Sequence, residues 1–389
     1  GAGQPVVLCA VDWLGIANES HDVFRATLAA AAGTTADRVA VHTLHQHDAP
    51  DCDFSAETIL AEAGLSRLNF DGTFAREVLR RLEVAVRESL SRTHPVTHVG
   101  TGSAPVHQVA SNRRIFGPDG KVRAVRYTAT PDPALRAEPE GTIDPELTTI
   151  SLWSTNRPVA ILTYYATHPQ SYYRTGIPNP DFPGIARFQR QLEVPEALPI
   201  HFNGAGGNLG AGKYNDGSPT NRGVLAGRLA DAMRRSWDST RREPLTANDV
   251  TWRVVRVPLP PSPHLKEAEL MAELQGRSGA FLTQGGASRL AWLRRCQAGH
   301  AIEVSCLSLG SAKLLHLPGE LFVEYQLAAK AVRPDRVVAM AAYGDYGPWY
   351  IGTSRAYAEG GYETEPRSSN VAPEVEPALM DAIRRALQD

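Results

Sequence analysis

The sequence predicts an α/β protein in which a mixed β-sheet is covered by helices. A strand, a helix and a second strand follow one another at residues 6–11, 22–32 and 38–43, and this βα unit is typical of helix-covered sheets. Two pairs of apolar runs separated by turn residues, at 148–165 and 301–317, predict hairpins. A βα unit gives parallel strands and a hairpin gives antiparallel ones, so the sheet is expected to be mixed.

The remaining elements of the first half follow from the apolar pattern. Residues 51–71 form a polar segment without a predicted element. Apolar residues from Phe74 to Leu90 then recur at three- and four-residue steps, which predicts an amphipathic helix packed on the sheet. Residues 111–142 show little periodicity and are expected to form a surface loop or ribbon. Further elements are expected at 98–106 (strand), 199–202 (strand) and 220–234 (helix).

The second half continues the alternation of strands and helices. A strand at 250–257 is broken by the proline-rich residues 258–263. The second hairpin ends in Leu317-Pro318-Gly319-Glu320, and Glu320 is expected to open a helix, where the helix dipole favours a carboxylate. Further elements are expected at 265–274, 287–296, 321–331 and 375–387 (helices) and at 337–342 (strand). No repeat or linker divides the sequence, so we expect one domain over residues 1–389.

Composition argues against several classes of protein. The 389 residues include 40 Lys and Arg against 42 Asp and Glu, without a basic stripe, so nucleic acid is not an expected partner. No window approaches the roughly 18 apolar residues of a spanning helix, and the start shows no secretion signal, so we expect a soluble chain. An extracytoplasmic location would require the removal of a signal. The four cysteines are scattered, which suggests neither a disulfide scaffold nor a thiolate zinc site. Compartment and oligomeric state stay open.

The most informative stretch is Val41-His42-Thr43-Leu44-His45-Gln46-His47-Asp48-Ala49-Pro50, which follows an apolar run. Residues two apart on a strand point the same way, so His45 and His47 are expected to address one point in space. That geometry suits a metal site or a paired acid and base. A polar loop that merely contains histidines is the alternative.

Two other predicted strands lead to residues that ligate metals. The strand at 159–165 runs into Ala166-Thr167-His168, and Glu320 follows the strand at 312–317. Histidine nitrogen and carboxylate oxygen belong to the ligand set of a catalytic zinc. A structural histidine and a helix-start carboxylate are the alternative interpretations. Spacing along the chain does not decide whether these residues converge.

Common nucleotide-binding and hydrolase motifs are incomplete or absent. Gly207 to Gly212 with Lys213 matches a phosphate-binding loop, but Tyr214 stands where a magnesium-binding Ser or Thr is required. No helix follows directly to hold the phosphates. Neither Gly-x-Gly-x-x-Gly nor Gly-x-Ser-x-Gly occurs, so a dinucleotide-binding protein and a nucleophile-elbow hydrolase are not indicated.

Several segments resemble the catalytic domain of neutral ceramidases and their bacterial relatives, a family of zinc-dependent amidases. The stretch from Leu44 to Pro50 is similar to the family's Thr-His-Thr-His-Ser-Gly-Pro. The other matching segments are Ser111-Asn112-Arg113, Ala166-Thr167-His168, Leu317-Pro318-Gly319-Glu320, Tyr350-Ile351 and Tyr362-Glu363-Thr364. They occur in the family's order. The resemblance implies a ceramidase-like α/β catalytic domain and a role in lipid or sphingolipid metabolism.

The resemblance also implies a zinc site. The ligands of one Zn²⁺ per chain would be His45, His168, Glu320 and Tyr350. The catalytic residues would be His47, Arg113 and Tyr362, and the substrate-binding residues Asn208 and Gly210. A zinc-activated water would attack the amide carbonyl, with His47 as general base or acid and with Arg113 and Tyr362 as donors to the oxyanion. A tight turn beneath a neighbouring loop is the alternative interpretation of the glycine-rich residues 203–212.

The sequence departs from the family at the glycine-rich loop. Gly207-Asn208-Leu209-Gly210-Ala211 stands where the family has Gly-Asp-Val-Ser-Pro, so Gly210 replaces the serine prominent in ceramidase sites. This excludes a mechanism through that hydroxyl and argues against ceramide as the substrate. We expect the domain to lack the family's C-terminal immunoglobulin-like domain and to have a shortened or divergent N-terminal segment.

The function expected from the sequence is hydrolysis of a linear amide in an N-acyl or lipid-like small molecule by a zinc-dependent enzyme. An esterase or lactonase on the same zinc site is the first alternative, because zinc hydroxide attacks esters as well as amides. A non-catalytic, metal-containing binding protein is the second, since a fold does not determine function.

Overall fold

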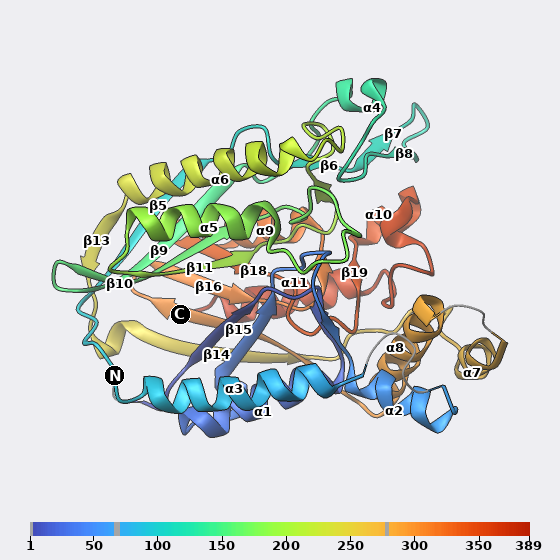
Figure 1. Ribbon diagram of the computed structural model, residues 1–389, viewed down its shortest axis with the longest axis horizontal. Coiled ribbons are helices and arrows are strands. Elements are labelled where there is room, and N and C mark those ends of the chain that lie inside the picture. The colour runs from blue at the N-terminus through green and yellow to red at the C-terminus, as the bar shows by residue number, and fades with distance from the viewer. Residues whose placement is uncertain (1–2, 66–70, 277–279) are drawn as a thin grey trace.

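The computed structural model describes residues 3–65, 71–276 and 280–389, and two β-sheets packed face to face lie at its centre (Figure 1). The five-stranded sheet has the order β11 (Leu198–Asn203), β10 (Arg157–Tyr165), β9 (Glu146–Ser154), β5 (His98–Pro105) and β13 (Arg241–Pro244). The four-stranded sheet has the order β14 (Val250–Val257), β15 (Ile302–Leu309), β16 (Ala312–His316) and β18 (Val337–Ala341). Both predicted hairpins, β9–β10 and β15–β16, are antiparallel pairs, as expected.

The alternation of side chains along the strands explains why the sheets stack. Leu314, Ala339 and Ala341 point into a core shared with the five-stranded sheet. Their neighbours Leu315 and Met340 point the opposite way, into a second core under helices. Successive side chains of a strand point to opposite faces, so a strand that is apolar at every position is covered on both sides.

Helices cover the outer faces of both sheets (Figure 1). The five-stranded sheet is covered by α5 (Asp181–Glu193) and α6 (Thr220–Asp238), and the four-stranded sheet by α9 (Val323–Val332) and α11 (Val375–Ala386). A parallel pair, β1 (Val7–Val11) and β3 (Val39–Thr43), packs against α1 (Glu19–Ala32), which contacts α3 (Thr73–Ser89). The helices α2 (Phe54–Glu62), α7 (Glu267–Gly276) and α8 (Ala280–Gln297) pack beside one another. The predicted α/β class with a mixed, helix-covered sheet is confirmed.

Helices α2 and α5 were not expected, nor were the short helices α4 (Pro133–Ala137) and α10 (Ser354–Glu359). The polar segment 51–71 contains β4 (Asp51–Cys52) and α2, which begins after Asp53, whose carboxylate accepts the amide of Ala56 at 3.0 Å. Residues 66–70 of that segment lie outside the described part of the chain. Helix α5 carries Pro183 in its first turn, where a missing amide donor costs nothing. Short or proline-containing helices give a weak periodic signal, so tertiary packing decides them.

The segment 111–142 is a ribbon, as predicted, but its first residues, 111–115, are buried and do not lie on the surface. It contains the short strands β6 (Ser111–Asn112), β7 (Arg114–Phe116) and β8 (Val122–Val125) and one short helix, α4 (Pro133–Ala137). The expectation for Glu320 was wrong: α9 begins only at Val323. Glu320 instead lies in β17 (Glu320–Leu321), which pairs in parallel with β19 (Tyr350–Ile351).

The carboxyl ends of the parallel strands meet on one side of the molecule. Three parallel pairs, β1–β3, β10–β11 and β16–β18, run toward this side. Backbone hydrogen bonds join the ends: Gly204 N to Tyr165 O (2.8 Å), Ala342 N to Asn203 O (3.0 Å) and Thr43 N to Tyr343 O (3.0 Å). The loops that leave these ends therefore start from fixed positions, which is the usual location of a site in α/β proteins. Within the described residues, no helix is both long and apolar enough to cross a bilayer.

Buried neutral histidines in the core predict a loss of stability in acid. Burial lowers the pKa of His42 and of His201 to about 3 from 6.5. The unfolded chain therefore binds protons that the folded chain rejects, so stability falls as pH drops from about 6.5 toward 3. Each group contributes roughly 1.4 kcal/mol per pH unit across that range.

His201 tests this dependence, because its ring accepts or donates one hydrogen bond, to the Thr163 hydroxyl at 2.8 Å. We expect His201→Asn to reduce the pH slope of the unfolding free energy by about one proton between pH 6 and 4. Urea unfolding at a series of pH values measures this slope. An unchanged slope would show that His201 is not held neutral by the fold.

Candidate metal centre

His45 and His47 follow the end of β3, and their convergence does not arise from strand alternation. The strand ends at Thr43, and His45 adopts a left-handed backbone with φ 61°. The expectation that both residues lie on one strand was therefore wrong. The amide of His45 donates to Trp13 O at 2.9 Å, which holds this unusual conformation. The two imidazole rings still meet, with centroids 4.9 Å apart.

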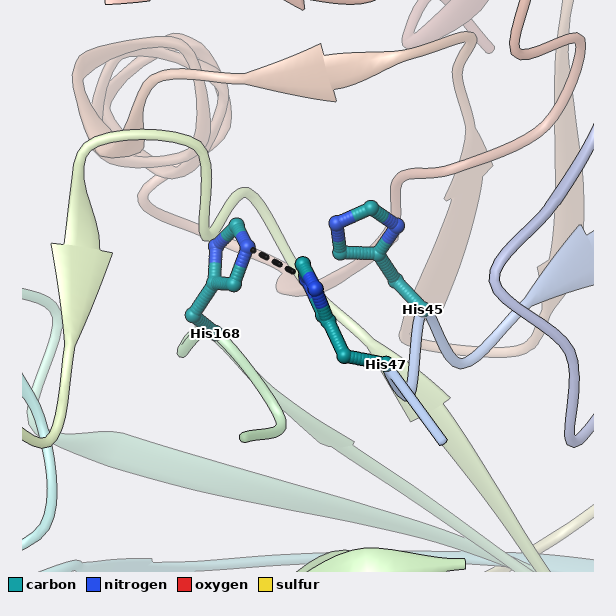
Figure 2. A group of neighbouring side chains, drawn as sticks. All are labelled: His45, His47 and His168. Atoms are coloured by element: carbon teal, nitrogen blue, oxygen red, sulfur yellow. Dashed lines mark hydrogen bonds between the residues drawn. The ribbon is translucent and has the colours of Figure 1, made fainter. Parts of the chain in front are cut away.

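A third histidine from a distant segment joins them. His168 follows β10, and one nitrogen of each of the three rings lies within 4.8 Å of the others (Figure 2). The Nε2 atoms of His47 and His168 are 3.2 Å apart. His45 and His168 are each 1% exposed, whereas His47 is only partly buried. This group can hold a metal ion.

His42, the first histidine of the stretch, is not part of this group. Its Nδ1 donates to Ala342 O at 2.7 Å, and its Nε2 lies 3.1 Å from Nδ1 of His316. Both rings are buried in the core behind the three-histidine group. His42 lies on β3 itself, so its side chain follows the strand and not the loop beyond it.

Glu320 reaches the same point. In the parallel pair β17–β19, Glu320 is opposite Tyr350, so both side chains leave the same face. The Oε2 atom of Glu320 is 3.2 Å from Nε2 of His45 and 3.7 Å from Nε2 of His168. Its other oxygen, Oε1, accepts the hydroxyl of Tyr346 at 2.5 Å. The structure thus brings His45, His168 and Glu320 together.

Arg113 and two tyrosines border this group. Arg113 Nη1 donates to the Tyr350 hydroxyl at 3.3 Å, and Nε lies 3.3 Å from a carboxylate oxygen of Glu363. The guanidinium carbon lies 5.6 Å from the ring centroids of both Tyr350 and Tyr362. The rings of His168 and Tyr350 are stacked at 6.4 Å. All seven residues assigned to metal or catalysis from the sequence therefore lie in one neighbourhood.

The hydrogen bonds around the histidines leave their lone pairs facing one another. Nδ1 of His45 lies 2.8 Å from Leu14 O, and Nδ1 of His168 lies 3.3 Å from Gly206 O. A carbonyl oxygen only accepts, so Nδ1 of His45 carries the hydrogen and its Nε2 carries a lone pair. Nδ1 of His168 also lies 3.4 Å from Nη1 of Arg113, which only donates. The tautomer of His168 that satisfies the closer Gly206 O has the hydrogen on Nδ1 and leaves a lone pair on Nε2. These Nε2 atoms point toward Oε2 of Glu320, which is also an acceptor.

Three acceptors without a proton between them repel one another unless a cation lies among them. Within the described residues, Nε2 of His45 and Oε2 of Glu320 are buried and make no hydrogen bond. Burial and the nearby cationic groups lower the pKa of His47 and His168 well below the usual value, which keeps their lone pairs available. Second-sphere bonds from Nδ1 to a carbonyl are typical of metal-ligating histidines. The residues therefore fit a divalent cation.

Tyr350 is a weaker ligand candidate. Burial, the largest cause, raises the pKa of its phenol well above the usual value. Without a cation, the hydroxyl therefore keeps its proton and accepts from Arg113. A tyrosine ligates as the phenolate, so its contribution depends on the charge of the metal and of Arg113.

The glycine-rich loop after β11 mainly supports the site from below. A Cβ at Gly207 would lie 2.3 Å from Glu320 O, and one at Gly206 would lie 2.6 Å from Thr167 O. Only glycine allows the loop to pass so close to the segments that carry Glu320 and His168. This supports the interpretation as a tight turn beneath neighbouring loops.

The two residues assigned to substrate binding are buried in this loop. Asn208 is 0% exposed, and its side chain accepts the amide of Val323 and donates to Glu324, both at 2.9 Å. It therefore fixes the start of α9. A Cβ at Gly210 would lie 3.4 Å from Cδ of Arg113, so a side chain there would contact this arginine. A substrate role for either residue stays a prediction.

Sequence patterns did not identify three neighbours of the site. Tyr343 stacks on the ring of His45 at 4.7 Å, and Tyr346 bonds Glu320. Tyr173 lies 5.5 Å from the ring of His47 and is 43% exposed. The Tyr- and Gly-rich composition of residues 343–362 predicts a loop but no partner for Tyr343 or Tyr346.

Asp48 fastens the loop that carries Tyr173. Its carboxylate accepts the amides of Arg174 (2.7 Å) and Thr175 (3.2 Å) and the hydroxyl of Thr175 (2.8 Å). Arg174 has a left-handed backbone, φ 64°, which arginine rarely adopts. Asp48, which directly follows His47 in the chain, therefore holds this loop against His47.

Removing this carboxylate should free the loop. We expect Asp48→Ala to speed trypsin cleavage after the exposed Arg174 by about tenfold, since three hydrogen bonds are lost. Asp48→Asn keeps one oxygen acceptor and should show a smaller effect. Limited proteolysis followed by mass spectrometry identifies the cleaved bond. Equal cleavage of wild type and Asp48→Ala would mean that Asp48 does not hold the loop.

Comparisons with known proteins agree with this geometry at the level of the fold. Neither a protein-family model nor a curated protein sequence matches the chain. A solved structure described as a ceramidase complexed with C2 superimposes with a TM-score of 0.65 at 16% identity, over 94% of this chain and 64% of that one. A crystal structure of neutral ceramidase from Pseudomonas aeruginosa superimposes with a TM-score of 0.63 at 17% identity, over 93% and 63%.

This chain spans less than two thirds of the length of both structures. At such low sequence identity, the likeness establishes the fold and not the activity. The described residues therefore have a neutral ceramidase-like fold.

Proposed function

We propose that the protein is a zinc-dependent hydrolase that cleaves the amide bond of an N-acyl or lipid-like small molecule. The observation that carries this proposal is the convergence of three buried acceptors, on His45, His168 and Glu320, at the carboxyl ends of the strands. The neutral ceramidase-like fold supports amide hydrolysis as the reaction.

Three residues would hold the metal through neutral or anionic atoms. These are Nε2 of His45, Nε2 of His168 and Oε2 of Glu320, with the phenolate oxygen of Tyr350 as the candidate fourth group. Bound zinc supplies a hydroxide-like nucleophile from water at neutral pH and polarises a carbonyl group. Three protein ligands of the His and carboxylate type are typical of catalytic zinc sites.

The surrounding side chains would move protons and bind charge. His47 is the candidate general base or acid: its lowered pKa keeps it neutral, and its partial exposure lets it meet a substrate. Arg113 Nη1 and the Tyr362 hydroxyl are the candidate donors to the oxyanion. Arg113 is held by Glu363, so it would bind this charge without reorganising.

Gly210 argues against a side-chain nucleophile at its position. Hydrolysis by activated water needs none. Ceramide is therefore not the favoured amide, and simpler linear N-acyl compounds are the first substrates to assay.

Tyr173 and Ile177, which is 70% exposed, lie on the loop beside His47 and would contact an apolar chain.

An esterase or lactonase on the same metal is the alternative, because activated water attacks both kinds of carbonyl. Amide, ester and lactone substrates of equal chain length, assayed side by side with zinc-loaded protein, separate these activities. Bound zinc without any turnover would favour a non-catalytic binding protein. Absence of bound zinc would contradict the proposal as a whole.

The roles of the histidines can be separated by metal content. We expect His45→Ala to abolish zinc binding, because it removes one of the three buried atoms that would hold the metal. We expect His47→Ala to keep the metal and to lower kcat by about 10²- to 10⁴-fold. Mass spectrometry of the purified variants measures zinc, and His201→Asn serves as a control histidine outside the site. Equal zinc loss in both alanine variants would make His47 a ligand.

Tyr362 provides a test of oxyanion stabilisation. Removing one donor of this kind typically lowers the rate by roughly 10²- to 10³-fold. We therefore expect Tyr362→Phe to lower kcat by this factor while its zinc content stays at the wild-type level. Steady-state kinetics and metal analysis of the same preparation test both expectations. A parallel loss of zinc and rate would mean that Tyr362 supports the metal.

A further inference from the structure

Building on the metal-dependent hydrolase proposed above, we infer that Tyr346 is a positioning residue that aims the carboxylate of Glu320 at the metal. The Tyr346 hydroxyl donates to Oε1 of Glu320 at 2.5 Å. The second oxygen, Oε2, is the one that faces His45 and His168. A carboxylate group is planar, so a bond that fixes one oxygen also fixes the direction of the other.

Glu320 needs such a partner. It is 1% exposed, so water does not orient its carboxylate. Among the residues that the structure describes, Oε2 has no hydrogen-bond partner. The hydrogen bond from Tyr346 to Oε1 therefore orients the carboxylate of Glu320. A free carboxylate would lose entropy on binding a metal, whereas one held in place is ready to bind.

Tyr346 is itself held from both sides. Its amide donates to Ile16 O at 3.0 Å, and its ring lies 5.4 Å from the ring of His45. A Cβ at Gly15 would lie 2.6 Å from the Tyr346 ring, so only glycine leaves room for it. The preceding residue, Asp345, accepts the amides of Asn18 and Gly347, both at 2.9 Å. The hydroxyl therefore has a fixed position next to Glu320.

Tyr343 supplies a matched control. Its ring also contacts His45, at 4.7 Å, and it is 0% exposed. Within the described residues, its hydroxyl is buried and makes no hydrogen bond. Tyr343→Phe therefore removes the same atom from the same neighbourhood without removing a hydrogen bond to Glu320.

The experiment measures zinc affinity in the metal-free full chain by competition with a chromogenic chelator. We expect Tyr346→Phe to weaken zinc binding by about 10- to 100-fold, the usual effect of losing a partner of a ligand. Tyr343→Phe should bind like wild type. In a Glu320→Gln background, Tyr346→Phe should have little further effect, because it acts through Glu320. The visible spectrum of the cobalt-loaded variant should also change, since the ligand is no longer aimed.

The outcomes separate this inference from the function it builds on. Wild-type zinc affinity and cobalt spectrum in Tyr346→Phe would overturn the role of Tyr346 and leave the hydrolase proposal intact. Equal losses in Tyr343→Phe and Tyr346→Phe would also overturn it. If wild type binds no zinc, both fail. If Tyr346→Phe does not fold, Gly15→Ala displaces the ring, and unchanged zinc affinity in that variant would overturn the inference.

Discussion

The structure depends on one electrostatic constraint, the meeting of lone pairs from His45, His168 and Glu320 in a space from which water is largely excluded. Such an arrangement is unfavourable without a cation, because each acceptor repels the next and none is solvated. The scaffold offsets this cost. The carboxyl ends of parallel strands are joined by backbone hydrogen bonds and hold the loops that carry the three groups. A cation turns the repulsion into binding.

Unusual backbone geometry occurs at residues around this site. His45, Tyr343 and Trp349 all have left-handed φ values, although none is glycine. Each such residue costs on the order of 1 kcal/mol or more, so the surrounding bonds must determine it. The backbone amide of His45 donates a hydrogen bond to Trp13 O, and that of Tyr343 donates one to Gly319 O. These bonds hold the two residues in the left-handed conformation. Strain at these positions accompanies the close approach of His45, Tyr343 and Glu320.

The outer surroundings of the site differ in rigidity and in chemistry. On one side, Arg113, Glu363 and Tyr350 form a buried, charge-paired wall. On the other side, an exposed loop with Tyr173 is fastened by Asp48 next to His47. A charged wall suits a polar reacting group, and an exposed aromatic loop suits an apolar chain. This division agrees with an amphiphilic amide as the proposed substrate.

Local sequence determined much of this molecule. The apolar runs specified the strands and both hairpins, because period-two burial is a local pattern, and the residues that follow those strands marked His45, His47, His168 and Glu320 as candidates. Resemblance to a family added Arg113, Tyr350 and Tyr362, which no periodicity distinguishes. The fold class followed from the order of these elements.

Only the tertiary structure decided which groups meet. The side chain of His42 lies in the core, whereas His45, whose backbone is left-handed, lies at the site. Glu320 lies in a two-residue strand and not at a helix start. The tertiary structure also brings the Tyr346 hydroxyl to Glu320 and the Asn208 side chain to the start of α9. These outcomes rest on contacts between residues far apart in the chain, such as Asn208 with Val323. Local periodicity and propensity carry no information about such pairs, because their partners are chosen by packing.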